Sequence, residues 1–154
     1  MKRRPLILLH IAALIAVSYV GCKAIASECL PQIHLGAAHA QRGYESTTPG
    51  IGIMCREDTL IAGAGVLRNS VAKTSRYAFA GWQPLRIGQT RFGALAGVID
   101  GYPYRNGKTF PFAAIAVSTP WEVAGRSGEL HLTLIPKVKN ISPWTAGVSF
   151  TVRF

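Results

Sequence analysis

The last ten residues, Thr145–Phe154, read "TAGVSFTVRF" and alternate between apolar and polar or small side chains. Val148, Phe150, Val152 and Phe154 fall on one side of an extended chain, and the residues between them fall on the other. A period of two is typical of a β-strand with one apolar face. The end of the chain therefore predicts a strand.

The same alternation recurs upstream, in short segments separated by turn residues. The predicted strands cover Cys29–Ala40, Gly50–Arg56, Thr59–Leu67, Ser75–Leu85, Thr90–Tyr102, Phe110–Thr119, Gly128–Ile135 and Thr145–Phe154. An even number of alternating strands can close on itself and leave no unpaired edge. We therefore expect an all-β chain that folds as an eight-stranded antiparallel barrel.

Alternation alone does not say which face of such a barrel points outward. A soluble, lipocalin-like carrier would turn its apolar face inward, whereas a membrane barrel turns it to lipid. The terminal Phe154 favours the membrane, and Glu129, His131 and Arg153 would be costly inside a soluble apolar cavity. Aromatic residues also fall near the predicted strand ends, where interfacial girdles belong: Tyr77, Trp82, Tyr102, Tyr104, Trp121 and Trp144. We predict a transmembrane barrel, with the soluble carrier as the alternative.

The first 26 residues have the anatomy of a secretory signal peptide. A basic start is followed by the apolar run Leu6–Val20, and Ala24-Ile25-Ala26 supplies small residues at the cleavage spacing. The apolar run is short for the roughly 20 residues of a spanning helix, which argues against a membrane anchor. A lipoprotein would use Cys22, but Tyr19 fits that pattern badly. The predicted organisation is thus a signal peptide over 1–26 and a barrel domain over 27–154.

Export changes how charge and cysteine content are interpreted. Cleavage lowers the net charge from +10 to +6, because it removes four basic residues and none of the seven acidic ones. Basicity is therefore no argument for a nucleic-acid partner, and we expect none. An oxidising compartment permits a disulfide between Cys29 and Cys55, but the sequence does not decide whether they pair.

Basic residues gather in the connections expected at the outward end, which are Gln41–Pro49, Arg68–Thr74, Pro103–Thr109 and Pro136–Trp144. With neighbouring Arg76, these connections hold Arg42, Arg68, Lys73, Arg105, Lys108, Lys137 and Lys139, against a single acid, Glu45. A basic rim would attract the phosphates of an outer leaflet rich in lipid A. Ordinary loop solubility is the alternative reading.

One outward loop, within "GVLRNSVAKTSRYAFAGW" (Gly65–Trp82), contains a serine that could carry chemistry. Acyl transfer by Ser70 requires a base, for which His34, His39 and His131 are candidates. Asn69 could orient an imidazole or donate a hydrogen bond to an oxyanion, but it cannot balance an imidazolium charge. From spacing alone, Asn69-Ser70 is a plain turn.

A family resemblance gives this loop a function. Asn69-Ser70, Lys73 and Gly81-Trp82 stand in the order and spacing found in the lipid A palmitoyltransferase family (PagP), small outer-membrane barrels that move a palmitate from phospholipid to lipid A. The similarity continues through "YESTTPGIGI" (Tyr44–Ile53), "RFGALAGV" (Arg91–Val98), "TLIP" (Thr133–Pro136) and "VRF" (Val152–Phe154). Most of the chain beyond the signal peptide is covered, in short fragments.

The resemblance implies roles for particular residues. Ser70 matches the family's functional serine and His34 its functional histidine, with His39 as the rival; on a regular strand these two histidines face opposite sides. Asn69 stands where the family has an aspartate, which puts the catalytic step in question. Gly81 matches the glycine at the floor of the acyl-chain pocket. Arg68 and Lys73 are expected at the lipid A site, and the prolines resembling those that open lateral gates for lipid are Pro31, Pro111 and Pro136.

The function implied is an outer-membrane lipid acyltransferase that moves an acyl chain from phospholipid to lipid A. A non-catalytic outer-membrane barrel with a lipid-binding or structural role is the alternative, and Asn69 favours it. We expect a monomer that uses no metal or cofactor and has phospholipid and lipid A as its partners. The family's N-terminal amphipathic helix has no room in Ser27–Gln32, so this chain would be a reduced version.

Overall fold

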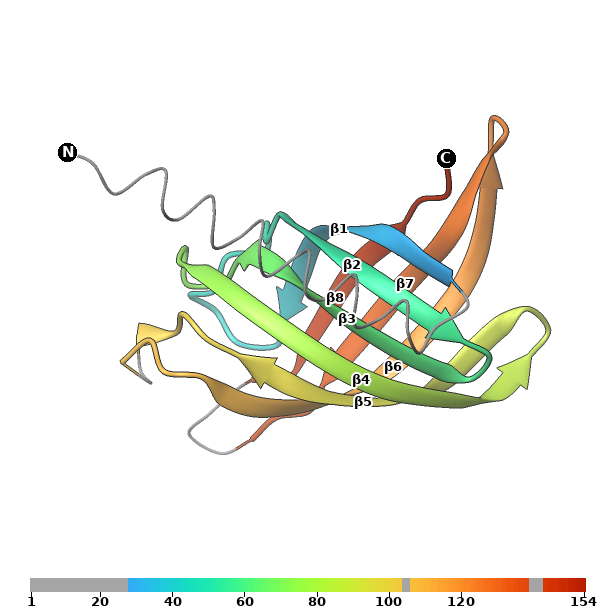
Figure 1. Ribbon diagram of the computed structural model, residues 1–154. Coiled ribbons are helices and arrows are strands. Elements are labelled where there is room, and N and C mark those ends of the chain that lie inside the picture. The colour runs from blue at the N-terminus through green and yellow to red at the C-terminus, as the bar shows by residue number, and fades with distance from the viewer. Residues whose placement is uncertain (1–27, 104–105, 139–142) are drawn as a thin grey trace.

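The computed structural model describes residues 28–103, 106–138 and 143–154, so the predicted signal peptide lies outside the described residues. Eight antiparallel strands form a closed barrel in sequence order, and β1 pairs with β8 to close it (Figure 1). The strands are β1 Glu28–His39, β2 Gly50–Glu57, β3 Leu60–Arg68, β4 Thr74–Ile87, β5 Thr90–Ile99, β6 Phe110–Val123, β7 Arg126–Ile135 and β8 Thr145–Thr151. The prediction of an all-β, eight-stranded antiparallel barrel is confirmed. In the part of the chain that is described, no helix is long and apolar enough to cross a membrane.

The connections differ between the two ends of the barrel. At one end, two-residue turns join β2 to β3, β4 to β5 and β6 to β7. Asp58, Gly88 and Ala124 in these turns have positive φ, as tight hairpins with right-handed strand twist require. The other end carries the longer loops 40–49, 69–73, 100–109 and 136–144. The basic loops identified in the sequence therefore share one end, which we call the loop end.

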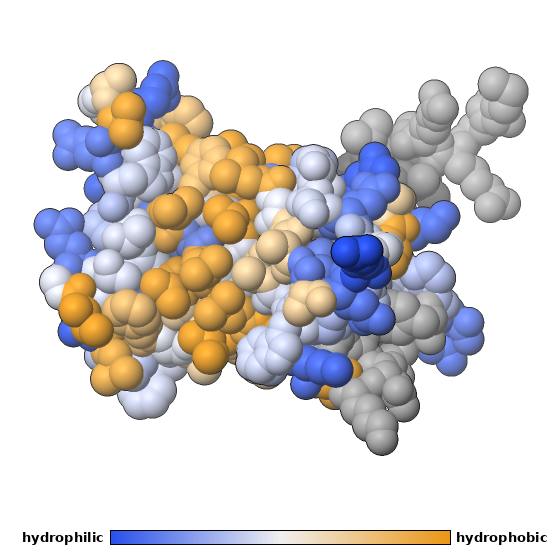
Figure 2. All heavy atoms as spheres, turned by 180° about the vertical axis from the view of Figure 1, so that it is seen from behind, coloured by the Kyte–Doolittle hydropathy of each residue, from blue (hydrophilic) through white to orange (hydrophobic). Residues whose placement is uncertain are grey.

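The strand alternation places apolar side chains outside and several charged side chains inside. Figure 2 shows hydrophobic residues gathered across the middle of one face, with hydrophilic residues toward both ends. The large apolar side chains that are exposed include Ile33, Leu35, Ile51, Leu60, Trp82, Leu85, Ile87, Val98, Ile115 and Leu130. Inside, the Glu129 carboxylate is 2.7 Å from Arg56 Nη2 and 2.8 Å from Arg91 Nη1.

The lumen changes character along its length, as the inward face of β4 illustrates. Starting from the loop end, that face carries Ser75 and Tyr77, then Phe79 and Gly81, then Gln83. The middle is the apolar core of the barrel, where Ile61, Leu95, Ala114 and Ala116 cluster and Phe79, Phe112 and Ile135 pack against them. Polar side chains lie on both sides of this core.

A disulfide joins β1 to β2 near the two-residue turns. Cys29 lies directly opposite Cys55 in the ladder, and the two sulfur atoms are bonded. The sequence left this pairing open, because two cysteines show nothing about their distance until the strand register is known. The register supplies that information.

The ends of several strands were predicted incorrectly from the sequence. β6 runs to Val123 and not to Thr119, and β7 begins at Arg126 and not at Gly128. The predicted strand stopped at Thr119, before Pro120, but pairing of β6 with β5 ends at Ser118, and proline is tolerated where a strand becomes an edge. The β6–β7 hairpin therefore extends beyond the neighbouring strands (Figure 1).

The placement of Tyr77 in an outer aromatic girdle is also wrong. Its side chain points into the lumen and is buried, because Tyr77 is in phase with Ser75 and Phe79 on the inward face of β4. Trp82 and Trp144 are exposed, consistent with the girdle prediction for those two residues. Tyr104 lies outside the described residues.

Candidate functional site

Asn69 organises the loop between β3 and β4 and is completely buried. Its Oδ1 accepts hydrogen bonds from the backbone N–H groups of Val71 (3.1 Å) and Lys73 (2.9 Å). Its Nδ2 donates to Ser75 Oγ (2.9 Å) and to the Gly101 carbonyl (3.2 Å). Both ends of the amide are thus used in holding the loop against the β5–β6 connection. The structure gives Asn69 a local architectural role that the sequence did not reveal.

Ser70 follows Asn69 and is also buried. Its backbone carbonyl accepts a hydrogen bond from Glu45 N (2.8 Å), which ties the first two loops together. Its side chain lies beside that of Tyr102. Burial raises the pKa of Tyr102, and the neighbouring Ser70 side chain opposes that rise. Ser70 is therefore held at the mouth of the lumen with a phenol as its neighbour.

A β-bulge places both candidate histidines inside the barrel. The β1–β8 register pairs His34 with Ser149 and then Gly36 with Val148, so one residue of β1 is unmatched between them. Such an insertion reverses the inward and outward phase of the strand. His39, which would face outward on a regular strand if His34 faces inward, faces the lumen as well.

His34 is engaged in a hydrogen-bonded chain across the lumen. Its Nε2 is 2.6 Å from Tyr77 Oη, and Tyr77 donates to Gln32 Oε1 (3.2 Å). Gln32 Nε2 in turn donates to Ser149 Oγ (2.9 Å). The bond to His34 is the shorter of the two that the phenol makes, and the tautomer of His34 sets which of the two atoms donates. Nε2 of His34 is therefore already engaged by Tyr77.

His39 is engaged through its other ring nitrogen. Thr145 Oγ1 lies 3.0 Å from His39 Nδ1 and 3.3 Å from the Pro143 carbonyl oxygen. In the tautomer that carries its hydrogen on Nδ1, Nε2 keeps its lone pair, as a base requires. Nε2 is buried and has no hydrogen-bond partner among the described residues. Burial lowers the pKa of His39, and the nearby Glu45 backbone opposes that effect by favouring the protonated form of the ring. Tyr44 stacks on the ring with centroids 5.0 Å apart.

Ser70 and both histidines line one cavity, which we call the lumen cavity. It has a volume of about 150 Å³ and extends from Ser70 and His39 down to Met54 and His131. A second cavity of about 140 Å³, the rim cavity, is also lined by Ser70 and His39 but not by His34. The geometry thus places His39 with Ser70 in both cavities and His34 with it in one.

The rim cavity lies where β6 extends beyond β7 at the loop end. Pairing of these strands begins at Ile115 with Leu134, so the loop-end segment Phe110–Ala114 of β6 extends beyond the paired part of β7. Pro111 and Ala113 face outward and line the rim cavity, which therefore reaches the outer surface of the barrel. Pro136 directly follows β7 at this point. Pro31 lies within the β1–β2 ladder, opposite Ile53, where pairing is continuous.

Gly81 faces the apolar core, where no side chain would fit. A Cβ built on it would lie 2.8 Å from the Ala94 carbonyl oxygen, 2.8 Å from Leu95 Cβ and 3.0 Å from Ile61 Cγ1. Real side chains essentially never approach so closely, so a larger residue must displace Ile61 and Leu95, which line the lumen cavity.

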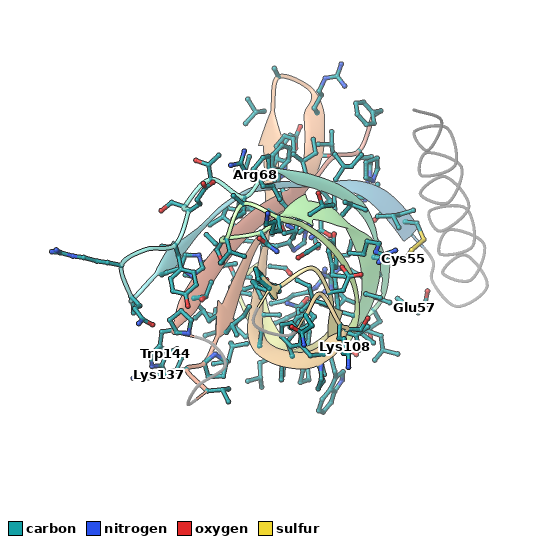
Figure 3. The ribbon with its side chains drawn as sticks, turned by 90° about the vertical axis from the view of Figure 1, so that its left-hand side faces the viewer. Cys55, Glu57, Arg68, Lys108, Lys137 and Trp144 are labelled. Atoms are coloured by element: carbon teal, nitrogen blue, oxygen red, sulfur yellow. A yellow bond between two sulfur atoms is a disulfide. The ribbon has the colours of Figure 1, made fainter. Side chains whose placement is uncertain are left out.

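The basic residues of the loop end differ in how they are paired. Arg68 forms an ion pair with Glu45 (3.1 Å) and Arg76 with Asp100 (2.6 Å). The side chains of Lys73, Lys108 and Lys137 are exposed, and Figure 3 shows Arg68, Lys108 and Lys137 at separate points around the barrel. Arg105 and Lys139 lie outside the described residues. No group of three potential metal ligands occurs in the described ranges.

Four polar residues of this site were not found from the sequence: Gln32, Tyr77, Tyr102 and Thr145. The period-two phase could have indicated Gln32, which shares a face with His34, and Tyr77, which is two residues from Ser75. Tyr102 and Thr145 join the site through tertiary contacts and the β1 bulge, for which we find no local signal.

Compared with known proteins, the chain matches no protein-family model and no curated protein. The functional assignment therefore depends on the geometry above and on the resemblance stated from the sequence.

Proposed function

We propose that the chain is an exported outer-membrane lipid acyltransferase related to the lipid A palmitoyltransferases. The observation that carries the proposal is that Ser70 and His39 line both the lumen cavity, which has apolar walls, and the rim cavity, which reaches the outer surface. A phospholipid tail would enter beside Pro111 and lie in the lumen above Gly81. Exposed lysines at the loop end would hold lipid A phosphates.

Insertion in the membrane is supported by the distribution of polarity. Apolar side chains cover the outside, and the Arg56–Glu129–Arg91 ion pairs lie inside. This is the reverse of a soluble carrier, in which the outward faces of the strands are polar. Short turns at one end and long loops at the other also match the usual outer-membrane arrangement, with the loops outward.

The chemistry proposed for this geometry has two steps. Ser70 Oγ attacks the phospholipid ester carbon while His39 Nε2 takes the serine proton, and that proton passes to the glycerol oxygen as the ester bond breaks. A lipid A hydroxyl then attacks the acyl-serine, and its proton returns to Ser70 through His39. His39 replaces His34 in this proposal because His34 Nε2 is already hydrogen-bonded to Tyr77, whereas His39 Nε2 has no such partner among the described residues.

The size of the lumen bears on the acyl group. An engineered protein cavity of about 150 Å³ binds benzene, a molecule of six carbons. The lumen cavity has about this volume, so a longer chain must extend through the rim cavity or displace Phe79 and Phe112 from its wall. The sixteen carbons of palmitate would therefore require movement of these aromatic side chains.

The second candidate, a non-catalytic barrel that binds lipid, is favoured by a specific observation. The partner of His39 Nδ1 is the Thr145 hydroxyl, which cannot balance an imidazolium as a carboxylate would. The amide of Asn69, at the family's aspartate position, is bound to the loop backbone and to Ser75.

One experiment separates the two functions. The protein would be expressed in a bacterial strain that lacks palmitoyltransferase activity, and lipid A would be examined by mass spectrometry. We expect an added acyl chain that is lost in Ser70→Ala and His39→Ala and retained, at reduced yield, in His34→Ala. No added chain from a folded barrel in the outer membrane would refute the enzyme proposal for this substrate and leave the lipid-binding barrel.

A further inference from the structure

His131 on β7 is a buried histidine that the proposed chemistry does not use. Its side chain points into the barrel, is 95 % buried and lines the lumen cavity. Nδ1 is 2.9 Å from Ser118 Oγ, whereas Nε2 has no hydrogen-bond partner among the described residues. A buried polar atom without a partner costs free energy, and most such atoms in native proteins are satisfied.

The side chains behind His131 determine which nitrogen carries its hydrogen. Arg56 Nη2 donates to Gln83 Oε1 (2.9 Å), and Gln83 Nε2 donates to the Ala116 carbonyl (3.2 Å), which fixes the orientation of the Gln83 amide. Gln83 Nε2 also donates to Ser118 Oγ at 3.0 Å. The Ser118 hydroxyl hydrogen is then directed to His131 Nδ1, its nearer acceptor, at 2.9 Å against 3.2 Å for Gln83 Oε1.

It follows that neutral His131 carries its hydrogen on Nε2. A hydrogen-bonded series of Arg56, Gln83, Ser118 and His131 thus ends in one N–H donor inside a cavity that also has apolar walls. Gln83 is completely buried and Arg56 is held by Glu129, so the series is rigidly supported. A hydrocarbon chain passing this point would leave the donor unsatisfied.

We propose that the lumen binds an aliphatic ligand that carries an oxygen acceptor along its chain, and that His131 Nε2–H donates to this oxygen. Ile61, Leu95 and the other members of the apolar core contact the hydrocarbon on either side of the oxygen. A hydroxyl-, ether- or ester-bearing chain fits this requirement better than a saturated hydrocarbon. The inference rests on the proposed function only in requiring that a chain can enter the lumen, and it needs no acyl transfer.

The test compares two probes of the same shape, di-n-propyl ether and heptane, which differ by one oxygen in place of a methylene. Full-length protein in lipid nanodiscs, with ¹⁵N-labelled histidine, is titrated with each probe while the His131 nitrogen signals are followed. We expect Nε2 to be the protonated nitrogen, and we expect the ether to bind about fivefold more tightly than heptane, as one net hydrogen bond provides.

Two variants complete the test. His131→Phe should bind both probes equally, because it keeps a ring and removes the donor. Thr133→Val, a change of similar size on the same face of β7, should keep the preference for the ether. Equal binding of the two probes by the natural protein, or a hydrogen on Nδ1, would overturn this inference. Either result would leave intact the part of the proposed function in which a chain enters the lumen. If neither probe binds, both the inference and the occupied lumen of the proposed function fail. If His131→Phe does not fold, the comparison of ether and heptane binding to the natural protein still decides whether the inference holds.

Discussion

Replacing Asn69 by aspartate restores the residue type expected from the resemblance, and the structure predicts that the change is harmful. The Nδ2 group donates to Ser75 Oγ and to the Gly101 carbonyl, and a carboxylate can donate to neither. The two interactions with Oδ1 would survive, because a carboxylate oxygen also accepts from Val71 and Lys73. The substitution therefore removes half of the hydrogen bonds of Asn69 and adds a charge.

The magnitude follows from the burial of the site. A buried polar group that loses its partner costs about 1–3 kcal/mol, so two lost donations cost roughly 2–6 kcal/mol. Ser75 still donates to the Asp100 carbonyl at 2.5 Å, which places the expected loss toward the lower end. A loss of this size is a large part of the 5–15 kcal/mol by which folded proteins are usually stable.

The cost should depend on pH in a defined direction. A protonated carboxyl has one O–H and recovers one of the two donations, whereas the ionised form recovers none and loses its hydration on burial. Folding therefore raises the pKa of the introduced aspartate, and its penalty is smallest at acid pH and grows as pH rises through that pKa. The difference between variant and natural protein isolates this effect from other titrations.

The assay is urea unfolding in lipid vesicles, followed by tryptophan fluorescence at several pH values. Asn106→Asp is the matched control, because Asn106 is exposed in a loop at positive φ, where aspartate is tolerated. We expect the control to be neutral within about 0.5 kcal/mol. If Asn69→Asp is as stable as the natural protein, or adds acyltransferase activity, the architectural role assigned to Asn69 is refuted.

Three further predictions concern the barrel. Replacing Cys29 and Cys55 together by serine should lower the free energy of unfolding by about 3.5 kcal/mol in urea titrations, as chain entropy gives for a separation of 26 residues. A reductant should lower the free energy of unfolding of the natural protein by the same amount and leave that of the variant unchanged. Gly81→Ala should cost about 1–3 kcal/mol through overpacking, whereas Gly147→Ala, whose Cβ meets only one atom at 3.9 Å, should not; equal costs would contradict the crowding at Gly81. Glu129→Gln should cost about 3 kcal/mol by removing the carboxylate that two arginines share, and an unchanged urea midpoint would show that these ion pairs are not stabilising.

The strands were predictable because period-two alternation is a local signal that burial on one face imposes. The alternation of the letters places Leu95 on the opposite face from Ala94 and Ala96, for example, and the structure shows Leu95 buried and the two alanines exposed. The disulfide and the lumen hydrogen bonds were not predictable, since they depend on register between strands far apart in the chain. Cys29 and Cys55 are 26 residues apart, and only the pairing of β1 with β2 brings them together.

The candidate site also combines features that the sequence predicts with features that only the fold reveals. Ser70 was placed correctly in a loop at the barrel end, and its burial and its contact with Tyr102 came only from the folded loops. The phase of His39 was set incorrectly because the sequence argument assumed a regular β1. "HLGAAH" (34–39) has no charged or polar residue between the two histidines whose side chain would reveal a change of phase.

The bulge in β1 also explains how one strand can place both His34 and His39 in the lumen. His34 must stay in phase with Gln32, because both join the hydrogen-bonded chain through Tyr77. A regular strand would then turn His39 to the outside, where an imidazole would face the apolar exterior. Gly36 permits the irregularity, since a Cβ there would meet the Ser46 carbonyl oxygen at 2.6 Å, and Ala37 N donates to that same oxygen at 2.8 Å. The first loop thus folds onto β1 at the bulge and brings Glu45 to Ser70, so the arrangement of Ser70 with His39 depends on a glycine that contacts neither side chain.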